Sequence, residues 1–390
     1  MYIDYSFIDT ITPLQWTLLG ILLLAFFIQL YYYLYLYNAV LRVKRRARKG
    51  NISFENAQPP ISVIVCAKNE SENLARFLPL LLEQDYPEFE VIVVNEGSTD
   101  ESNDILAEFS QKYSNLYHTY VPEGVKLLGT KKLALTVGIK AAKNDILLFT
   151  DANCKPVSDN WIANMIRNFS PHTDIVLGFS GYEKEKNVVS RLVSFNNLVY
   201  SLRYLGAAIN RRPYMGIGRN MAYRKELFFN TKGFASILHL PSGDDDLFIN
   251  KNATRKNTRV EISKESKVFA TQCSHRNFFI NKELRLSSMQ HYTFFGKYIS
   301  TAEMLSRGLF YAFLIILPLV GNAPVWITVA ALYLIRLVIQ EIVINRSAHH
   351  FDEQKSYFLL PLFDIYLLLM QSYIFVAFNL FHRKRMFRWK

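Results

Sequence analysis

Cysteine is scarce in this sequence, and its copies lie far apart. Cys66, Cys154 and Cys273 are the three cysteines among 390 residues. Their separations match neither the short spacing of a zinc site nor a disulfide framework. Neither a zinc-binding module nor a small disulfide-held secreted fold is therefore indicated, and the composition suits a reducing compartment. Internal repeats and low-complexity segments are also absent from the middle of the sequence.

Charged residues are missing from a long stretch near the N-terminus. No Asp, Glu, Lys or Arg occurs from Leu14 to Tyr37, and a helix of this length, at about 1.5 Å per residue, crosses a hydrocarbon core of ~30 Å. A secretory signal peptide carries its basic residues before a shorter apolar run, whereas here the basic residues follow. We therefore expect a retained transmembrane helix over residues 14–37, after a short tail of residues 1–13.

Basic residues gather directly after this stretch. They are Arg42, Lys44, Arg45, Arg46, Arg48 and Lys49. Short basic flanks stay on the cytoplasmic side of a membrane, so the basic linker of residues 38–60 predicts a multi-pass protein of the inner (cytoplasmic) membrane with its main domain in the cytoplasm. Much of the net charge of +12 comes from such flanks. Anionic membrane lipid is the expected partner of this cluster, and nucleic acid is not.

The C-terminal region of residues 305–382 is also apolar. Leu309–Asn345 is long enough for two spans broken near Gly321–Pro324, and Tyr357–Phe381 makes another apolar block. Three spans in this C-terminal region would leave the C-terminus outside the cytoplasm. The tail of residues 383–390 is basic, however, which favours the cytoplasm. Either two or three apolar helices span here, and in the first case one block is re-entrant or interfacial.

Short β-branched runs alternate with helical patterns between the apolar ends. Ile61–Ala67, Phe89–Val94 and Asp145–Thr150 have the length and composition of buried parallel strands. Amphipathic helical patterns follow the first two runs. This order predicts an α/β domain with a mainly parallel sheet over residues 61–300, flanked by transmembrane helices.

Polar clusters stand at the ends of the three predicted strands. They are Asn69 with Glu70, Asn95 with Glu96, and Asp151 with Asn153. Ligands of open α/β sheets bind beyond the carboxyl ends of the strands. Helix capping explains one such cluster equally well, but three acidic clusters at three strand ends indicate a site for a cation.

These segments resemble the family 2 glycosyltransferases, inverting enzymes with the Rossmann-like GT-A fold, and in particular membrane-anchored bacterial members. ISVIVCAKNESENL is similar to the opening strand and Asn-Glu turn of that family, which assigns Glu70 to the ribose and base of a donor nucleotide. VIVVNEGSTD resembles the Asp-Asp-Gly-Ser turn, with Asn95 and Glu96 replacing the aspartates. Glu96 is thereby assigned to the edge of the donor base.

Two further segments resemble the part of the family site that holds the donor diphosphate. GTKKLALTVGIKAA aligns Lys131 with a lysine near the donor phosphates. FTDANCKP occupies the place of the Asp-x-Asp motif, so that Asp151 and Asn153 are expected to hold Mg²⁺ or Mn²⁺. Because asparagine lacks the charge of a second aspartate, the expected metal affinity is lower.

The remaining matches concern the transferred sugar and the base. GIGRNMAYRKELF resembles the loop near the sugar, which assigns Gly218 and Asn220 to donor binding. SGDDDLFIN resembles the Glu-Asp-x-Asp-Leu motif. Asp244 is then the general base that takes the proton of the acceptor hydroxyl, with Asp245 and Asp246 beside it.

One motif of the processive members is not found at its expected place. Processive members carry Gln-x-x-Arg-Trp some forty residues beyond the base, whereas SSMQHYTFFGKY has Gln290 and His291 about where its arginine and tryptophan would stand. The resemblance therefore implies single transfer from a nucleotide-sugar, with UDP as the expected nucleotide, to a lipid-linked or membrane-associated acceptor. Such a reaction belongs to cell-envelope polysaccharide or glycolipid biosynthesis.

Two other classes of protein stay open at this point. Asn95, Asn153 and the missing arginine motif also suit a catalytically silent relative that binds a nucleotide or a partner glycosyltransferase. A transporter would need several ionisable residues along a path, and Arg336, Glu341 and Asp364 are few. Because charge is unfavourable in lipid, Arg336 and Glu341 are expected to face protein or each other.

Overall fold

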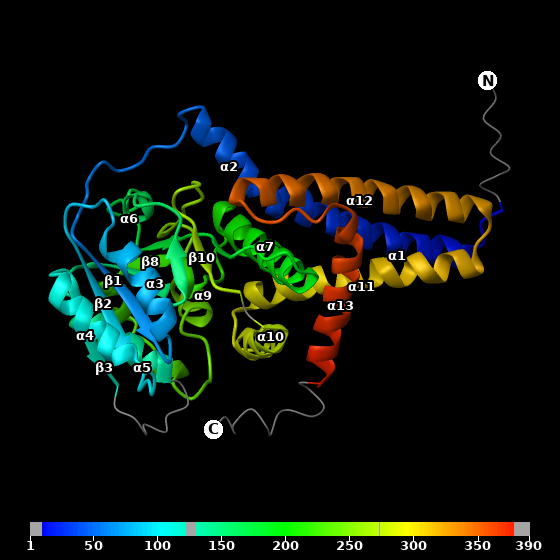
Figure 1. Ribbon diagram of the computed structural model, residues 1–390. Coiled ribbons are helices and arrows are strands. Elements are labelled where there is room, and N and C mark those ends of the chain that lie inside the picture. Colours follow the sequence, from blue (N-terminus) through cyan, green and yellow to red (C-terminus); the bar gives the residue numbers. More distant parts are fainter. Residues whose placement is uncertain (1–9, 122–129, 273, 378–390) are drawn as a thin grey trace.

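An α/β body and a projecting bundle of long helices make up the chain (Figure 1). The computed structural model describes residues 10–121, 130–272 and 274–377. Cys273, the basic tail of residues 383–390 and most of the predicted N-terminal tail lie outside the described residues.

The body is built on a seven-stranded sheet in the order β3-β2-β1-β4-β8-β6-β9. Its strands are β1 (Ile61–Ala67), β2 (Phe89–Asn95), β3 (Leu116–Tyr120), β4 (Ile146–Asp151), β6 (Ile175–Leu177), β8 (Met221–Arg224) and β9 (Thr258–Val260). β1 pairs in parallel with β2 and β4, and β2 pairs in parallel with β3. β8 runs antiparallel between β4 and β6, while β6 and β9 are parallel. The predicted mainly parallel α/β class and its three predicted strands are confirmed.

A second, three-stranded sheet and a set of helices complete the body. The sheet has the order β5-β10-β7, with β5 (Cys154–Pro156), β7 (Ser180–Tyr182) and β10 (Val268–Ala270). The helices are α3 (Ser71–Leu82), α4 (Ser102–Lys112), α5 (Thr130–Ala141), α6 (Trp161–Ile166), α7 (Val188–Ile209), α8 (Lys225–Asn230), α9 (Asp246–Asn252) and α10 (His275–Met289).

Both faces of the main sheet are covered, which explains why its strands read as continuous apolar runs. Val63 and Val65 of β1 belong to the core that contains Leu74 of α3, whereas Ile64 belongs to the core that contains Ala134 of α5. Successive side chains of a strand point to opposite faces. A strand with buried residues on both faces therefore has no polar alternation.

Glycine allows two of the close approaches between these layers. A Cβ at Gly138 of α5 would lie 2.9 Å from a methyl group of Ile64 and 3.1 Å from one of Val94. A Cβ at Gly206 of α7 would collide with the backbone of Leu36. A larger residue at either position would therefore push α5 away from the sheet or α7 away from the first membrane helix.

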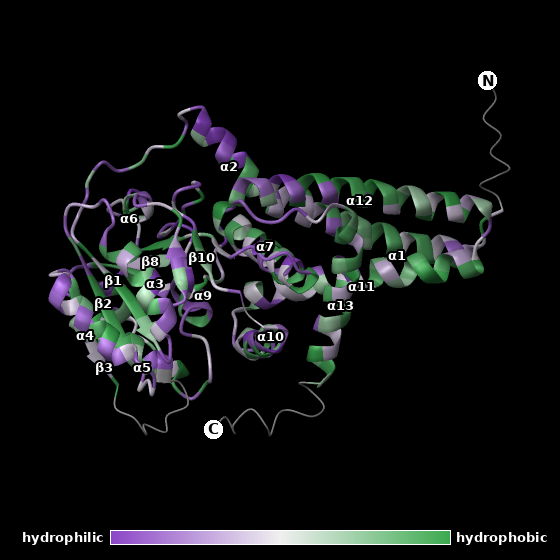
Figure 2. Ribbon diagram, in the orientation of Figure 1, coloured by the Kyte–Doolittle hydropathy of each residue, from purple (hydrophilic) through white to green (hydrophobic). Residues whose placement is uncertain are grey.

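Four helices of the described chain are long and apolar enough to cross a membrane. The first comprises α1 (Pro13–Leu30), the π-helical turns η2 (Tyr31–Tyr37) and α2 (Ala39–Arg48), and the others are α11 (Phe294–Val320), α12 (Ala323–Phe351) and η5 (Tyr357–Leu359) with α13 (Leu360–Ala377). In Figure 2 the ribbons of α1, α11 and α12 are largely green, the colour of hydrophobic residues, whereas α2 is mostly purple. The predicted break near Gly321 is confirmed, because α11 ends at Val320 and α12 begins at Ala323.

The last of these helices has a different direction from the others. α1, α11 and α12 lie side by side, whereas α13 crosses the end of the bundle that adjoins the body (Figure 1). α13 contacts α7, α10 and α11. One face of α13 is buried, and the other exposes large apolar side chains such as Leu362, Leu369 and Tyr373. The number of C-terminal helices that span a membrane stays a prediction.

A buried network of charges joins the helices at this crossing. Asp364 of α13 lies 3.2 Å from Arg307 of α11 and 2.7 Å from Arg336 of α12. Glu303 pairs with Arg307 and, at 3.5 Å, with Arg203 of α7. The side chains of all five residues are at most 8% exposed. Neutralisation by close partners is what makes such burial tolerable.

The expectation for Arg336 is confirmed in part. Arg336 faces protein, but its charged partner is Asp364, which comes from another helix. Glu341 instead accepts a hydrogen bond of 2.5 Å from Asn345, one turn along the same helix. Of the two predicted alternatives, that Arg336 and Glu341 face protein or each other, the first holds for Arg336, because the crossing of α13 supplies Asp364 as its carboxylate.

Asp364→Asn is predicted to destabilise the protein by about 3 kcal/mol, because two buried guanidinium groups lose their shared carboxylate. Thermal unfolding of the detergent-purified chain measures the effect. Asp352→Asn is the matched control, since its ion pair with Lys184 is exposed and contributes less than about 1 kcal/mol. Equal unfolding temperatures for the two variants would contradict the role assigned to Asp364.

Candidate active site

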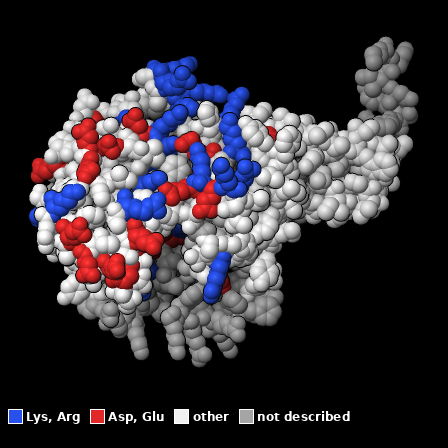
Figure 3. Space-filling view, viewed as in Figure 1, with Lys and Arg blue, Asp and Glu red and all other residues white. Residues whose placement is uncertain are grey.

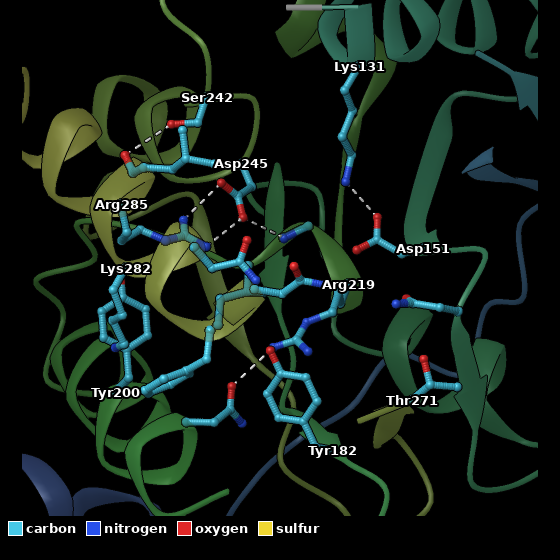
Figure 4. Close-up of a pocket in the computed structure, with 18 of the residues that line it drawn as sticks. Lys131, Asp151, Tyr182, Tyr200, Arg219, Ser242, Asp245, Thr271, Lys282 and Arg285 are labelled. Atoms are coloured by element: carbon cyan, nitrogen blue, oxygen red, sulfur yellow. Dashed lines mark hydrogen bonds and ion pairs between the residues drawn. The ribbon is translucent and has the colours of Figure 1, made fainter. Parts of the chain in front are cut away.

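A cavity of about 540 Å³ opens at the carboxyl ends of β1 and β4 (Figure 4). The second sheet, α7 and α10 supply its other walls. Seven of the residues predicted from sequence line it, namely Glu70, Lys131, Asp151, Asn153, Gly218, Asp244 and Asp245. The other three predicted residues, Glu96, Asn220 and Asp246, are not among the described residues that line the cavity.

The turn after β1 fixes the position of Glu70. Asn69 has a positive φ of 54°, and its side-chain oxygen accepts a hydrogen bond of 2.8 Å from the backbone N–H of Thr99 in the next strand-helix turn. Asp100 accepts from the backbone N–H of Ser71 at 2.9 Å. The side chain of Asn69 thus ties two turns together and does not cap α3, so the capping alternative is wrong here. Burial raises the pKa of Glu70, which accepts a hydrogen bond from Asn73.

The turn after β2 uses its asparagine for structure. Asn95 is buried, donates to Asn103 at 2.6 Å and accepts from the backbone N–H of Ser98 at 2.8 Å. Glu96 follows it, and the backbone N–H of Glu96 bonds Ala67 at the end of β1. An asparagine can therefore replace an aspartate at position 95 without loss of the turn, since its amide both donates and accepts.

Lys131 and Asp151 form an ion pair at the floor of the cavity. The Lys131 Nζ lies 2.7 Å from Asp151 Oδ1 at the end of β4 (Figure 4). Burial alone would lower the pKa of Lys131, but the charges of Asp151 and Asp244 outweigh it and raise that pKa. The lysine therefore stays cationic beside both carboxylates, which is the charge that a donor diphosphate requires.

Asp151 and Asn153 fit one side of a cation site. Their oxygens are the hard ligands that Mg²⁺ and Mn²⁺ prefer, and Mg²⁺ is often held by one or two carboxylates together with substrate phosphates. No group of three or more His, Cys, Asp and Glu side chains gathers for a metal in the described part of the chain. The donor set accordingly suits a cation shared with a diphosphate.

The three consecutive aspartates have three different environments. Asp245 accepts two hydrogen bonds from Arg285, at 3.0 and 3.3 Å, and one of 3.1 Å from the backbone N–H of Gly218 (Figure 4). Burial opposes its ionisation, but Arg285 prevails and lowers the pKa of Asp245. Asp245 is thus a fixed carboxylate that joins the loop carrying Gly218 to α10.

Asp246 and Asp244 differ from Asp245 because the pKa of each is raised. Asp246 is fully buried, accepts a 2.7 Å hydrogen bond from Tyr292, and has a pKa raised to about 6, chiefly by burial. Asp244 lines the cavity. Burial and the neighbouring charge of Asp245 raise the pKa of Asp244 above its ordinary value. A cavity-facing carboxylate with a raised pKa has the properties of a general base.

Asn220 is enclosed within the body. Its amide donates to the carbonyls of Phe179 at 2.7 Å and Ser266 at 2.8 Å, and its oxygen accepts from the indole of Trp161 at 3.1 Å. The side chain is 1% exposed. These three bonds hold the loop that carries Gly218 between the two sheets.

Cationic and aromatic residues on the far wall were missed from the sequence. Arg219 lies over the ring of Tyr182, at 4.5 Å from its centroid, and donates to Asn197 at 3.1 Å. Lys282 and Arg285 of α10 line the same cavity. Arg219 stands inside the loop already quoted, between Gly218 and Asn220, so its position was a usable signal.

Arg285 was also missed from the sequence. It contacts Asp245 from 40 residues further along the chain. Gln290 and His291 follow α10 and do not line the cavity in the described chain.

Comparison with known proteins agrees with this geometry. Residues 62–230 match the family model described as Glycosyl transferase family 2. Glycosyltransferase AglE of Haloferax volcanii is 31% identical over 146 residues, which cover 36% of this chain and 46% of the relative. Beta-monoglucosyldiacylglycerol synthase of Nostoc is 28% identical over 116 residues, which cover 29% of this chain and 24% of the relative. The chain spans less than half the length of these curated relatives.

A solved structure extends the likeness to the membrane helices. A mannosyltransferase of Pyrobaculum calidifontis, in complex with GDP-Man and Mn²⁺, superposes with a TM-score of 0.62 and 18% identity over 95% of this chain and 100% of its own. At this identity the likeness concerns the fold. The family match assigns residues 62–230 to Glycosyl transferase family 2, and the shared fold covers this region together with the long apolar helices.

Proposed function

We propose that the domain of residues 61–300 transfers a sugar, with inversion, from a nucleoside-diphosphate donor to a lipid-linked or membrane-associated acceptor. UDP-sugars are the first donors to test. The observation that carries the proposal is one cavity lined by both the Lys131–Asp151 pair and the carboxylate of Asp244. Phosphate recognition and proton acceptance are thereby available within one cavity.

Donor binding rests on the carboxyl ends of β1 and β4. Glu70 is assigned to the ribose and base and Lys131 to the diphosphate, while Glu96, assigned to the base edge, lies outside the cavity lining. Asp151 and Asn153 would hold Mg²⁺ or Mn²⁺, which would supply positive charge to the departing diphosphate. Lys131 adds a second positive charge, which it keeps because its pKa is raised.

Transfer itself is a single displacement at the anomeric carbon. Asp244 accepts the proton of the acceptor hydroxyl while the hydroxyl oxygen forms the new glycosidic bond and the bond to the diphosphate breaks. Asp245 and Asp246 position this base: one binds Arg285 and Gly218, and the other binds Tyr292. Attack from the face opposite the leaving group inverts the anomeric configuration.

The acceptor enters from the wall formed by α7 and α10. This wall offers amide groups and rings, including Asn197, Tyr200 and Asn281, which suit hydroxyl-rich ligands. α10 packs against α13, and His275 contacts the hydroxyl of Tyr366 at 3.0 Å. The cavity therefore adjoins the membrane part of the chain, as a lipid-linked acceptor requires. The name of the Nostoc relative, a glycosyldiacylglycerol synthase, supports an acceptor of this kind.

The arrangement of the helices supports a topology with three spans. α1, α11 and α12 cross the membrane, and α13 lies in its interface beside the body. The basic residues of α2 stand on the side of the body, which supports a catalytic domain in the cytoplasm at the inner membrane.

The direct experiment is nucleotide release from UDP-, GDP- and TDP-sugars by the full chain purified in native lipid extract. Turnover on one donor that needs Mg²⁺ or Mn²⁺ and stops on chelation is the expected result. If every donor is inert and calorimetry nonetheless detects nucleotide binding, the catalytically silent relative is correct.

Asp244→Asn is predicted to lower kcat by about 10²–10⁴-fold, because the acceptor hydroxyl loses its base. Nucleotide release with the active donor measures the loss, and calorimetry checks that donor binding persists. Asp104→Asn, on the exposed surface of α4, is the matched control and should retain wild-type activity. Full activity in Asp244→Asn would remove this residue from the mechanism.

Asp245→Asn is predicted to move the acidic limb of the pH profile of kcat/KM to lower pH. The wild-type rate falls as the pH drops through the pKa of Asp244, since protonated Asp244 accepts no proton. Burial and the charge of Asp245 hold that pKa above the ordinary value. Removal of the neighbouring charge lowers it again. A limb that stays in place, or moves to higher pH, in the residual activity of the variant would contradict this coupling.

A further inference from the structure

A second cavity, of about 510 Å³, lies between α2 and the β9 edge of the main sheet. Its lining contains seven cationic side chains, namely Lys44, Arg46, Arg48, Arg167, Arg211, Arg255 and Arg259. Figure 3 shows Lys and Arg gathered along α2 and over the adjoining edge of the body. Four segments that are far apart in the sequence therefore place positive charge around one hollow.

The negative charge within this cavity is too small to balance it. Its carboxylates are Glu55 and Glu261. Glu261 is already bound by Arg167 at 3.1 and 3.2 Å, by Asn168 at 2.7 Å, and by the backbone N–H of Ser263 at 2.6 Å. The carboxylate of Glu261 therefore neutralises Arg167 and does not neutralise the other cations.

Six of the seven cations form no ion pair with a carboxylate of the described chain. They are Lys44, Arg46, Arg48, Arg211, Arg255 and Arg259. Crowding of like charges is unfavourable unless an anion offsets it.

Membrane topology explains only part of the cluster. Cations on α2 suffice to keep a short flank in the cytoplasm. Arg211 follows α7, and Arg255 and Arg259 lie at β9, more than 200 residues after α2. These three contribute nothing to the orientation of α1, yet they converge on the same cavity.

The distance of the cavity from the apolar part of the first helix indicates the source of an anion. α2 continues the first membrane helix, and Lys44 lies seven residues after Tyr37, about 10 Å along the helix axis. Lipid headgroups occupy roughly this layer. The volume is within the range of about 300–1,000 Å³ that is typical of small-ligand sites, so a whole headgroup can enter.

We propose that this cavity binds a phosphate-bearing anion, supplied by the headgroup of an anionic membrane lipid. The bound lipid holds the body against the membrane surface at a point separate from the sugar-transfer cavity. Free phosphate or pyrophosphate has the same chemistry, and the experiment must distinguish the two sources.

Native mass spectrometry of the full chain in detergent provides the test, with dioleoyl phosphatidic acid and dioleoyl phosphatidylcholine as probes. The wild type is expected to retain phosphatidic acid in preference to phosphatidylcholine. Arg255→Glu with Arg259→Glu should lose about tenfold of that retention, because each nearby basic residue adds to the attraction. The control, Lys140→Glu with Lys143→Glu, makes the same charge change at exposed positions outside the cavity and should retain the lipid as the wild type does.

Thermal unfolding with inorganic pyrophosphate separates the two sources of phosphate. Stabilisation of the wild type by phosphatidic acid but not by pyrophosphate supports a lipid headgroup. Stabilisation by pyrophosphate, lost in the cavity variant, supports the phosphate site and overturns the lipid source. If the double Glu variant fails to fold, Arg255→Gln with Arg259→Gln takes its place. Equal lipid retention by the cavity variant and the control overturns the proposal, whatever the transferase assay gives.

Discussion

The position of the active site depends on the buried ion network where α13 crosses the bundle. Asp364 joins α13 to α11 and α12, and Glu303 joins α11 to α7 through Arg203. α7 and α10 are walls of the sugar-transfer cavity, and both contact α13. The same charges that hold the membrane helices together therefore set the acceptor side of the site. Loss of Asp364 would leave the buried guanidinium group of Arg336 without a carboxylate and would leave Arg307 with Glu303 alone.

Within the cavity, charge is divided between two carboxylate-cation groups. Asp151 and Asp244 keep Lys131 cationic, while Arg285 keeps Asp245 ionised. Asp244 is left with a raised pKa and access to the cavity. Three aspartates that are adjacent in sequence can thus perform different tasks, because their surroundings differ. Asp245 and Asp246 both pair with Arg285, Asp246 also accepts a hydrogen bond from Tyr292, and the charge of Asp244 acts on Lys131.

The sequence predicted the parts of the site that lie at strand ends. β-branched runs identified β1, β2 and β4, and a strand end places the next polar residues at the sheet edge, so Glu70, Asp151 and Asn153 could be found. The acceptor wall could not be predicted in the same way. Arg285 and Lys282 stand on a helix without a clear pattern, and the direction of α13 is set by contacts with α7, α10 and α11. Hydropathy gives the length of a helix and not its direction.

The central claim is a single displacement with Asp244 as the base, and the anomeric configuration of the product tests it most directly. Proton NMR is applied to the product that is formed from whichever donor the full chain turns over. It measures the coupling constant of the anomeric proton. The account predicts a configuration opposite to that of the donor sugar. Retention of the donor configuration would contradict it, because retention requires a second displacement that one base in this cavity does not provide.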